Sequence, residues 1–469
     1  MTNRPDFRLF NTMTRAVELF TPRVKDAVGI YCCGPTVYNF QHIGNLRTYI
    51  FEDLLTRTLQ TFGYKVHHVM NITDVGHLVG DGDLGEDKMM VAMRREGRSS
   101  YEIADYYTEA FFNDCAKLKI RRPGVVCKAT DHIPEMIALI QRIIANGFAY
   151  QSGGNVYFDV MKLPDYGKLA KLDLTKLQAG ARIDVDSNKR SPFDFVLWFT
   201  KSKFENQEMQ WDSPWGRGYP GWHIECSAMS MRYLGEEFDI HCGGIDHIPN
   251  HHTNEIAQSE AALGKPWVRH WMHGEFLVLN AAKMSKSTGG FITLTDLINQ
   301  GFDPIAYRLF CLSGHYRSQL NFSADAMQQA GASLSSLKRA VLKTREEAGN
   351  KAAQPRDEFL RDFYGAVAND LNMPQAIAVL WSVLGNKEIA ANERLGAAIS
   401  MDGILGLGIE DWREEATVDL PTEILTLVEA RKTAREGKLW KESDRLRDEI
   451  LAAGYVIEDA KDGMKVTKR

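Results

Sequence analysis

The pattern of apolar and polar positions divides the chain into an alternating first part and a largely helical last part. A short apolar run over 27–34 ends in a Gly-Pro pair and predicts a strand. A helical pattern follows over 43–61, with Gly63 as its stop signal. A second strand is predicted over 65–73. Strand, glycine-containing turn, helix and strand, in this order, open a doubly wound α/β sheet.

The pattern changes near residue 115, and α/β alternation resumes near Trp222. Between them, a helix, a hairpin with two glycines in its turn and a further strand are predicted over 132–146, 149–160 and 193–199. We interpret this segment as an insertion. After it, the pattern predicts a strand, a helix and a strand over 238–244, 249–264 and 273–280. Beyond Ser323 the chain is almost all helical by periodicity, with a last boundary expected in the linker at 409–421.

The composition is that of a globular protein with several domains. A length of 469 residues corresponds to about three domains, and 44% hydrophobic residues supply a core for each. No apolar run is long enough to cross a bilayer and the N-terminus lacks a signal-peptide core, so we expect a cytoplasmic protein without a membrane partner. Seven cysteines, an odd number, then favour metal binding or catalysis over disulfides. The net charge of −5 gives no sign of a nucleic-acid partner, which would need only a local basic surface.

A candidate phosphate site lies where the first predicted strand turns into the first predicted helix, at His42-Ile43-Gly44-Asn45. In an open α/β sheet the ligand lies beyond the carboxyl ends of the strands, where a helix N-terminus offers free N–H groups to phosphate. Gly44 permits close approach, and His42 and Asn45 are placed to contact phosphate oxygens. An ordinary polar helix cap accounts for the same residues, so this motif alone decides nothing.

A second candidate is the segment Lys-Met-Ser-Lys-Ser at 283–287. Lys283 and Lys286, on a loop of small residues, suit a mobile clamp that neutralises charge on a leaving pyrophosphate, although a solvated loop is the plain alternative. Together the two motifs resemble the signatures of class I aminoacyl-tRNA synthetases, His-Ile-Gly-His and Lys-Met-Ser-Lys-Ser. The second is intact, whereas Asn45 replaces the last histidine of the first and cannot become cationic.

A third set of residues combines two thiols, an imidazole and a carboxylate. His251 and Glu255 are four apart on a predicted helix and share one face, Cys226 lies in Gly-Trp-His-Ile-Glu-Cys, and Cys33 ends the first strand. Such donors suit Zn²⁺, but the spacing is not that of a zinc finger, and each residue taken singly is equally well a buried structural one.

The whole set resembles the zinc ligands of the cysteinyl-tRNA synthetase family, which land on Cys33, Cys226, His251 and Glu255. Cys32 and His252 are neighbouring alternatives, and Cys33 is preferred because it directly precedes the Gly-x-Thr segment, as in that family. Because four protein ligands usually mark a closed structural site, a structural zinc is the alternative to a substrate-selecting one.

The resemblance runs from about residue 31 to 322 and implies a Rossmann-type α/β catalytic domain with an inserted connective domain, a helical bundle and a small C-terminal anticodon-binding domain. The expected boundaries are 1–118 and 219–262 for the halves of the catalytic domain, 119–218 for the insertion, 263–325 for the unit with the Lys-Met-Ser-Lys-Ser loop, 326–410 for the bundle and 411–469 for the last domain.

The resemblance also implies a monomeric ligase that activates L-cysteine with ATP and Mg²⁺, selects it with one Zn²⁺, and transfers it to the 3′-terminal adenosine of tRNA(Cys). By resemblance, the leaving pyrophosphate is stabilised by His42, Asn45, Lys283 and Lys286, and ATP is bound by Gly44, Ser285, Lys286 and Ser287. The cysteine and adenylate pocket is lined by Gly34, Thr36, Thr73, Trp222, His241 and Asp246. The candidates for tRNA contact are Arg431, Arg435, Trp440 and Arg447, although mixed-charge helices are usually just solvated.

Two alternatives share most of these features. One is a related cysteine ligase with a small amino sugar as acceptor, which the C-terminal region disfavours because a small acceptor needs no anticodon reader. The other is a non-catalytic paralogue that binds tRNA or zinc, which the intact lysines disfavour and Asn45 leaves open.

Overall fold

The structure is a computed structural model that describes residues 5–75, 88–172, 187–201, 208–279, 291–413, 420–437, 439–460 and 463–468. The chain divides into two compact units, Met1–Glu410 and Asp411–Arg469, and each is described by itself.

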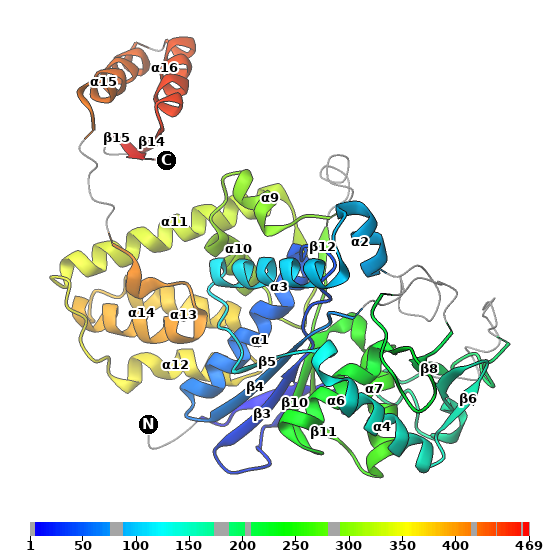
Figure 1. Ribbon diagram of the computed structural model, residues 1–469. Helices are drawn as coiled ribbons and strands as arrows, with labels where there is room; N and C mark the ends of the chain where they lie inside the picture. The colour runs from blue at the N-terminus through cyan, green and yellow to red at the C-terminus, as the bar shows by residue number, and fades with distance from the viewer. Residues whose placement is uncertain are drawn as a thin grey trace. The chain divides into compact units, whose positions relative to one another are not determined.

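A five-stranded parallel sheet forms the centre of the first unit (Figure 1). In spatial order its strands are β11 (Val268–Gly274), β10 (Phe238–Gly244), β3 (Ala27–Cys32), β4 (Lys65–Ile72) and β5 (Val125–Lys128). This is a doubly wound order, in which the winding reverses between β3 and β10. The strands predicted at 27–34, 65–73 and 238–244 are confirmed. The expected α/β fold is therefore present, with its ligand crevice beyond the carboxyl ends of β3 and β10.

Helices cover both faces of this sheet (Figure 1). On one face lies α1 (Ile43–Thr61), with the bounds that the pattern predicts, and on the other lie α6 (Trp222–Leu234) and α7 (His251–Leu263). The side chains between the sheet, α6, α7 and α4 (Ile133–Ala145) form one large hydrophobic core. Two further helices, α2 (Lys88–Glu96) and α3 (Ser100–Lys117), follow β4, and α3 lies beside α1.

The segment predicted as an insertion contains a separate antiparallel sheet of β6 (Ala149–Ser152), β7 (Asn155–Phe158), β8 (Phe195–Phe199) and β9 (Tyr219–Pro220). The predicted hairpin is confirmed, and its turn residues Gly153 and Gly154 have φ of +58° and +101°, which glycine adopts without strain. The parallel strand β5, however, lies inside the range 119–218, so part of that range belongs to the central sheet.

The strand predicted at 273–280 is wrong in its extent. β11 ends at Gly274, and a separate short strand, β12 (Leu277–Leu279), pairs with β13 (Leu320–Phe322) in another sheet. Between them, the carbonyls of Glu275 and Phe276 accept hydrogen bonds of 2.8 and 2.6 Å from the guanidinium of Arg47 on α1. The Glu275 N–H also donates to the Tyr316 carbonyl at 2.8 Å, and the Phe276 carbonyl accepts from the Leu320 N–H at 3.2 Å. The chain thus leaves the central sheet at this point, and one apolar run forms two strands.

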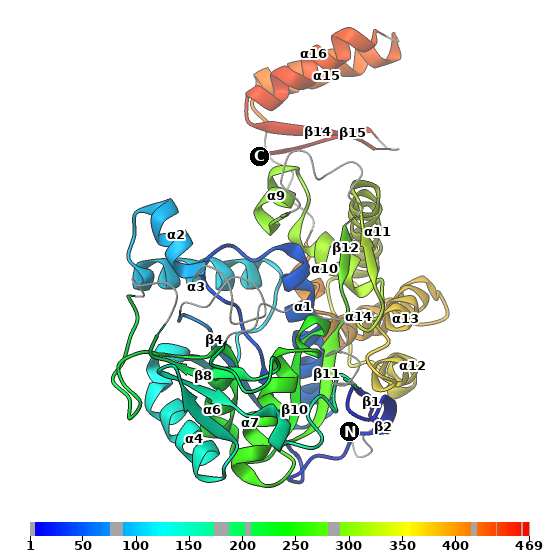
Figure 2. The same ribbon diagram turned by 90° about the vertical axis from the view of Figure 1, so that its right-hand side faces the viewer.

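The rest of the first unit is helical from Ser323, which caps α11, as predicted. Two helices, α9 (Leu294–Asn299) and α10 (Pro304–Leu312), precede Ser323. The helices after it are α11 (Ala324–Glu347), α12 (Asp357–Ala368), α13 (Met373–Gly385) and α14 (Ala391–Leu405), which pack together (Figure 2). A buried ion network ties α1 to this part: Asp53 accepts from Arg57 at 2.7 Å and from Arg308 on α10 at 2.6 Å. A β-hairpin of β1 (Arg8–Asn11) and β2 (Ala16–Leu19) lies near the N-terminus.

The second unit consists of α15 (Thr422–Glu436), α16 (Trp440–Ala452) and an antiparallel pair, β14 (Tyr455–Ala460) and β15 (Gly463–Lys468). The helices agree with the predicted pattern, whereas the strand pair was not predicted. Across the described parts of both units, no helix is long and apolar enough to span a membrane.

Candidate metal centre and active-site cavity

A cavity of about 330 Å³ opens beyond the carboxyl ends of β3, β4 and β10. Of the residues predicted for function, its wall contains Cys33, Gly34, Thr36, His42, Asn45, Thr73, Trp222, Cys226, Asp246 and His251. The chain brings these together from segments more than two hundred positions apart in sequence. The wall also contains residues that were not predicted, among them Tyr38, Gln41, Asn71, His247 and Phe291.

The start of α1 faces this cavity with its histidine in a defined orientation. His42 is the N-cap of the helix, and its Nδ1 accepts a hydrogen bond of 3.1 Å from the backbone N–H of Asn45. Because Nδ1 is an acceptor, a neutral ring carries its proton on Nε2. Burial lowers the pKa of His42, which favours that neutral form. The polar cap and the phosphate-binding role are therefore compatible, since one nitrogen caps the helix and the other remains a donor.

Gly44 is not part of the cavity wall, and its role is to leave room for His42. A Cβ on Gly44 would lie 3.0 Å from two atoms of the His42 ring. Gly34 is constrained more tightly, because a Cβ there would lie 1.7 Å from the backbone carbonyl oxygen of Asn71.

A chain of hydrogen bonds crosses the floor of the cavity from β3 to α6. The Gly34 N–H donates to Oδ1 of Asn71 at 2.8 Å, and Nδ2 of Asn71 donates to the Thr73 hydroxyl at 3.0 Å. That hydroxyl donates to the fully buried carboxylate of Glu225 at 3.1 Å. Asn71 and Glu225 were missed by sequence reasoning, and their position next to Thr73 and Cys226 was the available signal.

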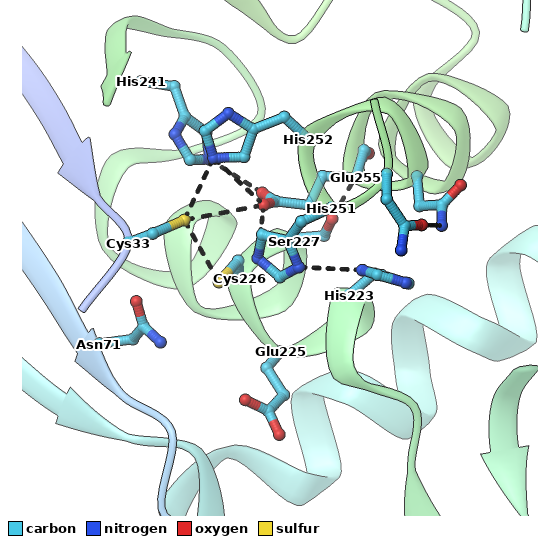
Figure 3. Close-up of polar contacts among 12 residues, drawn as sticks. Cys33, Asn71, His223, Glu225, Cys226, Ser227, His241, His251, His252 and Glu255 are labelled. Atoms are coloured by element: carbon cyan, nitrogen blue, oxygen red, sulfur yellow. Dashed lines mark hydrogen bonds and ion pairs between the residues drawn. The ribbon is translucent and has the colours of Figure 1, made fainter. Parts of the chain in front are cut away.

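The four predicted metal ligands lie together, fully or almost fully buried (Figure 3). Their ligand atoms are all within 4.8 Å of one another. The sulfurs of Cys33 and Cys226 are 3.9 Å apart, and His251 Nε2 lies 3.0 Å from Glu255 Oε1. In a tetrahedral zinc site with Zn–S bonds of about 2.3 Å, two sulfurs lie about 3.8 Å apart. The donors and their spacing therefore fit a zinc ion.

Two further histidines orient these ligands from behind (Figure 3). His241 contacts Oε2 of Glu255 at 2.8 Å, which leaves Oε1 toward the other ligands. His223 contacts Nδ1 of His251 at 2.9 Å, which leaves Nε2 toward them. Such second contacts fix the orientation and the protonation of metal ligands. His241, which was predicted to line the cysteine pocket, is fully buried and is not part of the cavity wall.

A second group of Cys33, His241, His252 and Glu255 has a similar spacing. His252 Nε2 lies 3.3 Å from Cys33 Sγ, but its Nδ1 contacts His273 at 2.8 Å, and His273 contacts the Thr12 hydroxyl at 2.7 Å. Neither His241 nor His252 lies on the cavity wall, whereas Cys33, Cys226 and His251 do. The first group is therefore the one that a substrate can reach. Cys32, the other alternative, is buried, and this burial, followed by interactions with Cys242 and Glu52, raises the pKa of its thiol.

Interactions among the metal-ligand residues shift their pKa values even without a metal. Burial raises the pKa of Glu255, but interactions with His241 and His251 outweigh it and bring the pKa to about 2. Burial lowers the pKa of His251, yet Glu255 and Cys226 raise it to about 10. Burial raises the pKa of Cys226, and a hydrogen bond from Cys33 together with the charge of His251 more than reverses this. Two of the four ligands, Glu255 and Cys226, are thus favoured as anions, whereas burial and the neighbouring Cys226 raise the pKa of the Cys33 thiol.

The remaining cavity residues surround this group. The Trp222 ring lies 4.3 Å from the His251 ring between centroids, so the indole forms a wall beside the ligands. Asp246, which follows β10, also lines the cavity. Lys283, Ser285, Lys286 and Ser287 lie outside the described residues. Directly after them, Phe291 lines the cavity and contacts the His42 ring, with centroids 5.5 Å apart.

The candidates for tRNA contact differ in accessibility. Arg431 is buried at 2% exposure inside the second unit, which contradicts its predicted place on a contact surface. Trp440 is 57% exposed, and the Arg435 guanidinium lies 5.8 Å from its ring centroid. Arg447 is exposed and lies 3.8 Å from Asp444.

Comparisons with known proteins place this geometry in a family. Residues 19–332 match the model of the class I (C) tRNA synthetase catalytic domain, and residues 417–466 match that of the cysteinyl-tRNA ligase anticodon binding domain. The chain is 50% identical to a cysteine–tRNA ligase of Treponema denticola, over 96% of this chain and 97% of that one.

The chain belongs to the cysteine–tRNA ligase family.

Another member, cysteine–tRNA ligase 1 of Burkholderia lata, is 47% identical over 98% of this chain and 96% of its own length. Among solved structures, the methionyl-tRNA synthetase of Mycobacterium tuberculosis bound by methionyl-adenylate is similar with a TM-score of 0.54. It is 14% identical and covers 81% of this chain and 90% of its own, so the likeness is one of fold.

Proposed function

We propose that this chain is a cysteine–tRNA ligase, which activates L-cysteine with ATP and transfers it to the 3′-terminal adenosine of tRNA(Cys). The observation that carries the proposal is the placement of two thiols and an imidazole on the wall of the cavity that also contains the start of α1, with the Glu255 carboxylate beside these ligand atoms. Family membership supports the same reaction. We also propose that the chain acts as a monomer in the cytoplasm.

The metal that these residues fit best is Zn²⁺, held by Cys33, Cys226, His251 and Glu255. When bound, zinc would take the thiol of cysteine as a thiolate, a soft ligand that the hydroxyl of serine cannot match. A pocket that selects by shape alone distinguishes such neighbours by only ~1–3 kcal/mol. Trp222, which lines the cavity next to His251, would form the wall beside the thiol of the substrate.

For the activation step, the cysteine carboxylate attacks the α-phosphate of ATP, and pyrophosphate leaves. Nε2 of His42 and the side-chain amide of Asn45 would donate to the phosphate oxygens, at the positive end of the α1 dipole. Mg²⁺ is expected to accompany ATP on the phosphates. Lys283 and Lys286 would neutralise the leaving pyrophosphate. We place these lysines near the start of α1 because the chain that follows them lies there: the Ile43 N–H donates to the Ile292 carbonyl at 2.8 Å.

For the amino acid, the floor of the cavity supplies a second set of contacts. Asp246 is placed to accept from the ammonium group or from the ribose of ATP. The Thr73 hydroxyl, which donates its hydrogen bond to Glu225, lines the same space and would accept a hydrogen bond from the substrate. In the transfer step a ribose hydroxyl of the tRNA attacks the acyl carbon and AMP leaves, so no protein nucleophile is required.

The acceptor is proposed to be tRNA(Cys) and not a small amine, because residues 417–466 match an anticodon-binding domain. Trp440, Arg435 and Arg447 are the accessible candidates for contact with RNA in this unit.

The test is cysteine-dependent ATP–pyrophosphate exchange, run beside serine, before and after removal of metal by a chelator. Exchange with cysteine alone, lost on chelation and restored by Zn²⁺, would support both the reaction and the metal. Lys286→Ala should reduce exchange at least tenfold with little change in cysteine binding, whereas Lys343→Ala, on the exposed surface of α11, should not. No exchange by folded, zinc-loaded protein would refute the proposal, and charging of tRNA(Cys) would test the acceptor.

A further inference from the structure

The buried Arg47 side chain joins two segments that are distant in sequence to the start of α1. Arg47 is 4% exposed. One terminal nitrogen of its guanidinium donates to the carbonyls of Glu275 and Phe276 at 2.8 and 2.6 Å. The other terminal nitrogen donates to the carbonyls of His315 and Ser318 at 3.2 and 2.6 Å. A single side chain therefore holds both segments.

These two segments lead into the strands β12 and β13. One directly precedes β12 and the other precedes β13, and the two strands pair in parallel. β12 also lies next to the first turn of α1 (Figures 1 and 2). A Cβ on Gly44 would lie 3.8 Å from the Cβ of Leu277, which is ordinary van der Waals contact. Arg47 therefore binds the base of the β12–β13 pair to the helix whose start is proposed to bind phosphate.

The chain that follows the Lys-Met-Ser-Lys-Ser segment is bound to the same helix. The Ile43 N–H donates to the Ile292 carbonyl at 2.8 Å. The buried Tyr307 hydroxyl on α10 donates to the Ile43 carbonyl at 2.6 Å. The described residues on either side of the segment 280–290, which contains the two proposed lysines, are thus both attached to the first turns of α1.

The chemistry of the Arg47 contact favours arginine over other side chains. A buried cation is tolerated where hydrogen bonds replace its hydration, and here four carbonyl oxygens do so. A planar guanidinium presents its donors in a rigid fork, whereas an ammonium group is a point charge with three donors. The fork can therefore hold two segments at a fixed separation. Because the acceptors are carbonyl oxygens of the main chain, the contact fixes the backbone itself.

We propose that Arg47 is a positioning residue for the activation step, which sets the chain carrying Lys283 and Lys286 against the phosphate site at the start of α1. The inference rests on the proposed ligase function, since there the lysines act on pyrophosphate. Arg47 is not on the wall of the catalytic cavity. A misplacement of about 1 Å can cost roughly 10²-fold in rate. Loss of Arg47 should therefore slow activation and leave the KM for cysteine, which is proposed to bind at the metal ligands, unchanged.

The first experiment compares Arg47→Met with wild type in cysteine-dependent ATP–pyrophosphate exchange at saturating zinc. Arg47→Met should lower kcat at least about tenfold and keep the KM for cysteine within about twofold. The matched control is Arg394→Met on α14. Arg394 is 3% exposed and donates to the carbonyls of Leu384 and Ile389 at 2.9 and 3.1 Å, so its loss also leaves buried carbonyls unpaired. This control should lower the melting temperature and keep kcat within about twofold of wild type.

A double-mutant cycle with Lys286→Ala separates positioning from a general loss of structure. If Arg47 acts through the lysines, Arg47→Met should lower exchange by less than about threefold in the Lys286→Ala background. Additive losses would overturn the proposal, and so would an unchanged kcat in Arg47→Met or an equal loss in Arg394→Met. If Arg47→Met does not fold, Arg47→Lys takes its place, because it keeps the charge with fewer donors. Activity of Arg47→Lys equal to that of wild type would overturn the proposal.

Hydrogen–deuterium exchange tests the contact without the reaction. Peptides covering residues 275–279 and 318–322 should take up deuterium faster in Arg47→Met and not in Arg394→Met. Uptake equal to that of wild type in both peptides would show that Arg47 does not hold these strands, and would overturn the proposal. Absence of cysteine-dependent exchange in the wild-type chain refutes the ligase function and this inference with it. An active wild type and an equally active Arg47→Met refute the inference alone.

Discussion

Replacing His241 distinguishes a ligand-orienting role from contact with the substrate. In the structure its Nε2 lies 2.8 Å from Oε2 of Glu255, and the ring stacks on Trp271 with centroids 4.6 Å apart. His241→Phe keeps a stacked ring and removes the donor. Glu255 then keeps one oxygen toward the metal ligands and loses the bond that fixes the other. His241→Gln restores a donor of similar reach and is the matched control.

The expected magnitude follows from the position of His241 behind the ligand. Loss of such a second contact lowers metal affinity about 10- to 100-fold, which is ~1.4–2.8 kcal/mol. The carboxylate, fully buried, is also left with an unsatisfied oxygen, so the metal-free protein should lose roughly 1–3 kcal/mol of stability. The KM for cysteine, measured at saturating zinc, should stay near that of wild type, because His241 is not on the cavity wall.

The assay is competition for Zn²⁺ against a chromophoric chelator, followed by cysteine-dependent pyrophosphate exchange in excess zinc. We expect weakened zinc binding in His241→Phe, substantial recovery in His241→Gln and near-normal exchange for both once zinc is saturating. An unchanged zinc affinity combined with a raised KM for cysteine would refute the reasoning and place His241 against the substrate.

Three further predictions concern the frame around the site. Gly34→Ala should abolish most exchange activity and lower the melting temperature, because its Cβ would lie 1.7 Å from the rigid Asn71 carbonyl. Asp53→Asn should destabilise the first unit by about 3–5 kcal/mol in urea unfolding, since it leaves the buried Arg308 guanidinium without its charge partner; a loss below 1 kcal/mol would contradict this. The pKa of His68 is about 4 in the folded chain, below its ordinary 6.5, so the unfolded chain binds more protons between these values. Stability should therefore fall by up to ~3 kcal/mol as pH drops from 6.5 to 4, and His68→Gln should flatten that part of the pH profile of unfolding.

The sequence by itself determined the elements and the chemistry that they carry. The bounds of α1 and the strands β3, β4 and β10 follow from local apolar runs and glycine stops, which depend on neighbours a few positions away. The pairing of His251 with Glu255 follows from the helix period in the same way. The family resemblance then named the ligand set that the structure brings together.

Tertiary structure decided which of two adjacent candidate ligands faces the metal site. Cys32 and Cys33 are adjacent, but side chains alternate between the two faces of a strand. Cys33 therefore contacts Cys226, whereas the thiol of Cys32 interacts with Glu52 on α1. The same packing places His241 against Glu255, brings Asn71 and Glu225 into the floor of the cavity, and interrupts the strand predicted at 273–280.

The physical reason is that periodicity fixes the direction of a side chain relative to its own helix or strand. The distance to a side chain on another element depends on how crossovers and core packing set those elements against each other. Glu225 illustrates this limit, since nothing in the local sequence of α6 shows that its buried carboxylate accepts a hydrogen bond from Thr73, which follows β4.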